Sequence, residues 1–125
     1  MSQRTTPGYA YASAFDAGAR VIHLAGACPL DADGSISPVG DYAGQAEKCV
    51  ENMLAALAEA GGTLTDIAYT RVLVASSRNE DLGTVWTVVH TAFAEHEVPS
   101  TLFGVTVLGY ENQLVEIEAV AAIGR

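Results

Sequence analysis

Hydrophobic residues recur along the chain with two spacings, and each spacing predicts a different kind of element. Apolar positions three or four apart predict one helix between Asp41, its expected N-cap, and the Gly61-Gly62 pair. The same spacing predicts a second helix between the polar residues 76–81 and Pro99. Residues 28–41 are dense in Pro, Gly, Asp and Ser, which is typical of a loop.

Runs of β-branched and aromatic residues predict the strands. Residues 9–15 and 20–26 lie on either side of an Asp/Gly turn and predict an N-terminal hairpin. Three further strands are expected over 66–76, 100–109 and 112–123. The order is therefore ββαβαββ. It predicts an α+β domain in which two helices cover one face of a mixed sheet of four to six strands.

The predicted last strand contains two acidic residues in an otherwise apolar stretch, "QLVEIEAVA" at residues 113–121. Glu116 and Glu118 are two apart and share one face of a strand, while Ile117 points to the other face. Unpaired carboxylates beneath helices would cost several kcal/mol. We therefore expect both glutamates on the helix-free face. That face is expected to be apolar, from stretches such as "LFGVTVL", and this predicts an oligomer in which the sheets of neighbouring copies meet.

Composition narrows the class of protein. The 125 residues predict one domain over 1–125. The formal charge of −9 and six scattered basic residues argue against nucleic acid as a partner. No stretch has the pattern of a signal peptide or of a membrane span, so a cytoplasmic protein with reduced thiols is expected. The two cysteines, Cys28 and Cys49, have no zinc-site spacing, and no metal-ligand spacing links the three histidines.

Four stretches in order resemble the RidA/YjgF family, the reactive-intermediate deaminases. They are Tyr11 in "YASAF", "AGACPLD" at 25–31, "QAEKCVENMLAALAEAGGTLTD" at 45–66, and "LVEIEAVA" at 114–121. The resemblance implies a chorismate-mutase-like fold and a homotrimer whose sheets form a central barrel with clefts between subunits. In deaminating members the cleft binds a small imine or enamine acid and hydrolyses it to a keto acid and ammonia. No metal or organic cofactor is implied.

Carried over residue by residue, the resemblance suggests the site. Glu116 corresponds to the catalytic glutamate that holds the attacking water, and Tyr11 to the tyrosine that orients the substrate. Gly26 corresponds to the strand-end glycine whose backbone approaches the ligand. Trp86 corresponds to a polar residue of the cleft, which it would narrow or reshape.

The arginine that clamps the substrate carboxylate in the family motif P-A-R-[ST] is missing. An ungapped alignment from the C-terminal end places Ser100 at its position, so Ser100 and Thr101 are expected to offer hydrogen bonds instead. A hydroxyl cannot reproduce the bidentate contact of an arginine. Arg71 either reaches the cleft as a substitute or forms a structural ion pair with Glu116 or Glu118.

Two classes of function remain. One is an imine or enamine hydrolase acting on a substrate other than the usual 2-imino acids. The alternative is a non-catalytic trimer that binds a metabolite between subunits. The endoribonuclease and translation-inhibitor roles associated with the family are disfavoured by the acidic charge. Cys28 is either a reactive thiol near the cleft or a small buried hydrophobe.

Overall fold

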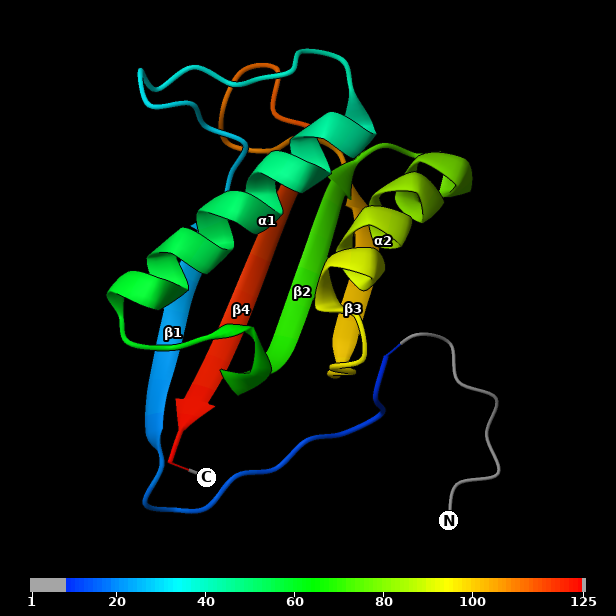
Figure 1. The fold of residues 1–125 in the computed structure, drawn as a ribbon. Helices are drawn as coiled ribbons and strands as arrows, with labels where there is room; N and C mark the ends of the chain where they lie inside the picture. The colour runs from blue at the N-terminus through cyan, green and yellow to red at the C-terminus, as the bar shows by residue number, and fades with distance from the viewer. Residues whose placement is uncertain (1–8, 125) are drawn as a thin grey trace.

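The computed structural model describes residues 9–124, which form a four-stranded sheet with two helices packed on one face (Figure 1). The elements in chain order are β1 (Arg20–Ala27), α1 (Tyr42–Glu59), a 3-10 turn (Leu64–Asp66), β2 (Ile67–Ala75), α2 (Asn79–Phe93), β3 (Ser100–Val105) and β4 (Val115–Ile123). This mixed α+β arrangement confirms the predicted class of fold.

The order of strands across the sheet is β1-β4-β2-β3. β4 lies antiparallel between β1 and β2, and β2 pairs with β3 in parallel. Alternate residues of the central strand β4, such as Val115 and Ile117, are fully buried under the helices. They meet the apolar stripe of α1, in which Cys49, Met53 and Leu57 are buried.

Local signals determine where α1 begins and ends. The Asp41 carboxylate accepts a hydrogen bond from the Gly44 backbone N–H at 2.9 Å, which caps the first turn as predicted. The chain leaves the helix through Gly61, whose φ of 95° lies in the region that favours glycine.

The predicted N-terminal hairpin is wrong. Residues 11–18 are exposed and form no strand; they run along the ends of the strands from β3 toward β1 (Figure 1). The reason is a contact further upstream, where Ala10 forms a parallel bridge with Pro99 just before β3. This bridge holds Ala10 at the edge of the sheet opposite β1. The intervening residues must therefore cross the width of the sheet and cannot pair with β1. The Asp16–Ala19 turn is nevertheless present, with a hydrogen bond of 3.0 Å.

The second face of the sheet carries no helix (Figure 1). Glu116 and Glu118 are half-exposed on this face, whereas their neighbours Val115, Ile117 and Ala119 are buried, which confirms the predicted orientation of β4. In β1, Val21 is an exposed apolar residue, whereas its neighbour Ile22 is buried. No helix within residues 9–124 has the length and apolar character needed to cross a membrane.

Candidate functional site

The Glu116 carboxylate is held at the junction of β4 with the end of β1. Its Oε1 atom accepts a hydrogen bond from Gln113 Nε2 at 3.2 Å and from the Cys28 thiol at 3.6 Å. The Oε2 atom lies against Gly26, where an added Cβ would be 2.2 Å away. The register of β1 against β4 shifts between Leu24 and Ala27, so Gly26 lies in a bulge. Only glycine permits this approach of the backbone to the carboxylate.

Gln113 is a buried amide that places the glutamate. The turn before β4 closes with a hydrogen bond from Gln113 N to Tyr110 O at 3.1 Å. The side chain is 3% exposed, with Oε1 accepting from Tyr110 N and Nε2 donating to Val115 O as well as to Glu116. Because each polar atom of this amide is engaged, the donor facing Glu116 is fixed in advance.

Cys28 is the second donor to Glu116. Burial, followed by the charge and the hydrogen bond of Glu116, raises the pKa of the Cys28 thiol from 9.0 to about 11. The thiol is therefore protonated at neutral pH and donates to the carboxylate. Asn52 anchors this segment, since its Nδ2 donates to the carbonyls of Cys28 and Leu30 at 2.8 and 3.0 Å. A raised pKa argues against Cys28 as a reactive nucleophile.

Arg71 forms the structural ion pair that was one of its two expected roles. Its guanidinium lies 3.3 Å from Glu118 Oε1 and 5.5 Å from the centre of the Phe103 ring. Both partners of the ion pair are substantially exposed. Within residues 9–124, no basic side chain contacts Glu116, so its carboxylate is held by neutral donors alone.

The other predicted site residues gather at the outer edge of β3. Trp86, Ser100 and Thr101 line a pocket of about 480 Å³ together with Tyr9 and Leu102. The ring of Tyr11, which is 55% exposed, lies beside this pocket, 5.7 Å from the ring of Tyr9. The structure thus brings Tyr11, Trp86, Ser100 and Thr101 together, but it places Glu116 and Gly26 at a different strand junction.

Ser100 and Thr101 face opposite sides of the sheet. Ser100 pairs with the buried Thr70, and the Thr70 hydroxyl donates to Ser100 Oγ at 2.7 Å on the helix-covered side. Thr101 pairs with Arg71 on the helix-free face, the face of Glu116. Counting P-A-R from Pro99 also leads to Thr101. The ungapped alignment thus leads to Ser100 on the helix-covered side, and the count from Pro99 leads to Thr101 on the face of Glu116.

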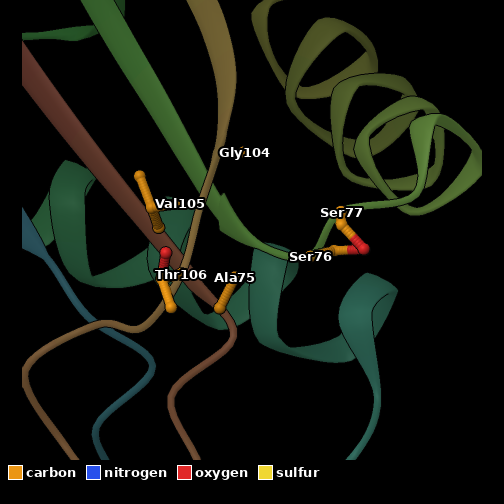
Figure 2. A pocket seen from close by; sticks show the side chains of 6 residues that line it. All are labelled: Ala75, Ser76, Ser77, Gly104, Val105 and Thr106. Carbon is orange, nitrogen blue, oxygen red and sulfur yellow. The ribbon is translucent and has the colours of Figure 1, made fainter.

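A further hollow of about 440 Å³ lies where β2 and β3 end, lined by Ala75, Ser76, Ser77, Gly104, Val105 and Thr106 (Figure 2). None of these six residues has a side chain that titrates near neutral pH. The Ser76 hydroxyl donates to Asp81 at 2.7 Å and is thus used within the fold. The Glu116 junction offers acid–base chemistry that this hollow does not.

Sequence reasoning missed Gln113 and Tyr9 as site residues. Gln113 is a polar residue three positions before Glu116, at the start of an apolar strand, and this was the available signal. Tyr9 is brought to Trp86 by the bridge between Ala10 and Pro99, which no local pattern indicates.

The mixed four-stranded sheet with two helices on one face defines an α+β protein. Residues 1–123 match the family model described as endoribonuclease L-PSP, and the chain belongs to this family, the RidA/YjgF family. The protein YyfB of the Rid family from Yersinia pestis is 23% identical, with a TM-score of 0.84 over 98% of this chain and 95% of that one.

Two E. coli structures are also similar. The YjgF gene product is 28% identical, with a TM-score of 0.73 over 95% of this chain and 91% of that chain. TdcF, solved with bound serine, is 26% identical, with a TM-score of 0.72 over 94% of this chain and 89% of that chain. These likenesses agree with the chorismate-mutase-like fold that the sequence resemblance implied.

Proposed function

We propose that the protein is a hydrolase that releases ammonia from an imine or enamine, with Glu116 as the catalytic carboxylate. The geometry of Glu116 carries this proposal. Its Oε1 atom is fixed by Gln113 and Cys28, and its Oε2 atom faces the backbone of Gly26. Within residues 9–124 no hydrogen-bond donor contacts Oε2, so this oxygen is available to orient a water molecule.

The proposed chemistry uses one carboxylate twice. Glu116 accepts a proton from water as the water oxygen attacks the imine carbon, and it passes this proton to nitrogen to give a carbinolamine. It then accepts the hydroxyl proton and passes it to nitrogen as the C=O bond forms, the C–N bond breaks and ammonia leaves. The balance is R₂C=NH + H₂O → R₂C=O + NH₃. A protonated Cys28 thiol and a neutral Gln113 amide orient the carboxylate without neutralising its charge. No electron transfer is required.

The proposal includes a homotrimer, because the two groups of site residues lie at opposite sides of one sheet. Glu116 and Gly26 lie where β4 meets β1, whereas Trp86 and Thr101 lie at β3, the strand at the other end of the order β1-β4-β2-β3. A head-to-tail arrangement brings the β3 edge of one copy to the β1 side of the next, and it closes as a ring. Light scattering of the purified protein measures the number of copies.

The substrate is proposed to differ from the usual 2-imino acids, because Thr101 provides no charge for a carboxylate. Thr101→Arg should raise the turnover of 2-iminopropionate by about 10-fold or more, the value of a charged hydrogen bond. Ser100→Arg is the matched control: it places the guanidinium on the buried side next to Thr70 and should destabilise the fold without this gain. Equal turnover in Thr101→Arg and the unaltered protein would contradict the missing-clamp argument.

The catalytic role of Glu116 is tested with imines that a dehydratase or an amine oxidase generates in the assay. The rate of ammonia release is measured, and Glu116→Gln should reduce it to the uncatalysed rate. Glu118→Gln, two residues along on the same face and paired with Arg71, should retain it. If both variants keep full activity, Glu116 is not the catalytic group.

The alternative is a non-catalytic trimer that binds a metabolite in the same cleft. It is supported by the absence of the clamping arginine at Thr101, since loss of substrate positioning removes much of an enzyme's acceleration. Binding without turnover on every imine tested would favour this alternative. An RNA-directed activity is disfavoured by the net charge of −9. We place the protein in the cytoplasm, where free thiols stay reduced.

A further inference from the structure

The pocket at the edge of β3 has the size of a small-molecule site and an uncharged lining. Its volume is about 480 Å³, within the range usual for ligand pockets. The lining residues Tyr9, Trp86, Ser100, Thr101 and Leu102 carry aromatic, aliphatic and hydroxyl side chains. Burying a charged ligand group against them would be unfavourable without a partner of opposite charge. The pocket therefore suits a neutral ligand.

Two aromatic contacts fix the orientation of the Trp86 indole. His90 stacks nearly parallel to it, with an interplanar angle of 10° and ring centres 6.2 Å apart. Tyr9 meets it edge to face, at 81° and 5.9 Å. The two rings of Trp86 and Tyr9 therefore stand almost perpendicular and form an aromatic corner. A further flat ring can pack on either wall in the offset or edge-on geometry that aromatic rings prefer.

The Ser100 hydroxyl supplies a neutral hydrogen-bond donor next to this corner. Ser100 Oγ accepts the proton of Thr70, which leaves the proton of Ser100 for another acceptor. The Thr101 hydroxyl lies on the other face of β3, 3.3 Å from the Tyr69 hydroxyl, so Ser100 is the donor on the side of Trp86. This donor matches a carbonyl oxygen or an imine nitrogen attached to the bound ring.

We infer that this pocket binds the planar aromatic ring of a neutral substrate, by packing on Trp86 and Tyr9 and by a hydrogen bond from Ser100. The inference rests on the proposed function for its turnover and names the substrate class as aryl imines. For the simplest member the reaction is C₆H₅CH=NH + H₂O → C₆H₅CHO + NH₃. Ring packing thus provides the anchoring that an arginine would provide for a carboxylate.

Binding is tested without catalysis, using benzamide as the probe and cyclohexanecarboxamide as its non-aromatic counterpart. Trp86 is the only tryptophan in the chain, so its fluorescence reports directly on the pocket. Benzamide should bind more tightly than the cyclohexyl amide. Measured by calorimetry, Trp86→Ala should weaken benzamide binding about 10-fold, and Trp86→Phe should weaken it less. Trp86→Ala should weaken binding of the cyclohexyl amide by a smaller factor than binding of benzamide.

Tyr110→Leu provides the matched control, because it removes an exposed aromatic ring from the loop that follows the end of β3, whereas Ser100 and Thr101 lie at the start of that strand. It should leave benzamide binding unchanged. Equal affinities for the two amides, or no binding of benzamide, would overturn the inference. So would a Trp86→Ala variant whose oligomeric state changes while its benzamide affinity does not, since the pocket would then be a contact between copies.

Turnover is tested with benzaldimine and cyclohexylmethanimine, each released by a flavin amine oxidase from the corresponding amine and trapped by semicarbazide. The protein should reduce trapping of the aryl imine more strongly, and Trp86→Ala should remove this preference. Glu116→Gln should abolish turnover while retaining benzamide binding. If benzamide binds but neither imine is hydrolysed, the proposed function fails and the binding inference stands. If both imines are hydrolysed equally, the proposed function stands and the inference of an aromatic-ring site fails.

Discussion

Replacing Glu116 by glutamine should make the Cys28 thiol react faster with an alkylating reagent. The Cys28 sulfur lies 3.6 Å from Glu116 Oε1, and burial together with this carboxylate raises the pKa of the thiol to about 11. At pH 9, roughly 1% of such a thiol is ionised, and only the thiolate reacts. Removing the negative charge favours the thiolate, so the rate should increase.

The size of the increase follows from the separation. At a spacing of 3.6 Å, two unit charges in a water-like dielectric interact by about 1 kcal/mol, which corresponds to a rate increase of roughly fivefold. Because solvent screens charges at this half-buried site, the water-like dielectric is used for the interaction between the thiolate and the carboxylate. Burial is the largest cause of the raised pKa and persists in the variant, so Cys28 should still react more slowly than an exposed thiol.

The assay is alkylation by iodoacetamide at pH 9, with the modified peptide quantified by mass spectrometry. Glu118→Gln is the control, because the Glu118 carboxylate is paired with Arg71 and does not contact Cys28. The buried Cys49 in the same protein should stay unmodified throughout. An unchanged rate in Glu116→Gln, or an equal acceleration in Glu118→Gln, would refute the thiol–carboxylate contact and with it the proposed orientation of Glu116.

Three further substitutions test the packing of the site and the fold. Gly26→Ala would place a Cβ 2.2 Å from Glu116 Oε2, so the carboxylate must rotate away. Imine turnover should therefore fall about 100-fold, whereas the free energy of unfolding in urea should fall by only about 1 kcal/mol. The fully buried Gln45 amide donates two hydrogen bonds to backbone carbonyls and accepts one from the Leu114 N–H, so Gln45→Leu should lower the free energy of unfolding in urea by about 2–4 kcal/mol. Gly83→Ala meets no atom within 4 Å on α2 and should stabilise the protein by about 0.5–1 kcal/mol, visible as a higher Tm; a lower Tm would contradict the open surroundings of Gly83.

The two helices were predictable because their signals are local. The Asp41 cap, the three-to-four spacing of α1 and the glycine at position 61 all act within a few residues, and the structure reproduces them. The strands were predicted less completely. Residues 100–109 have strand character, but β3 ends at Val105, since pairing with β2 ends there.

The neighbours of each strand could not be read from the sequence. β3 and β4 are consecutive in the chain, yet β4 lies between β1 and β2 and does not touch β3 in the sheet order. Residues 9–15 have the alternation of a strand, but one bridge from Ala10 to Pro99 holds them at the wrong edge for a hairpin. Pairing depends on contacts between residues far apart in the chain, which periodicity does not encode.

The sequence by itself determined the class of fold, the family resemblance and the face on which Glu116 and Glu118 lie, because a strand alternates its side chains with a period of two. Only the tertiary structure decided what surrounds Glu116. The bulge at Gly26, the Cys28 thiol and the buried Gln113 amide come from different segments and meet the carboxylate only when β1 and β4 pair. The same applies to Thr101, whose side of the sheet was set by its pairing with Arg71.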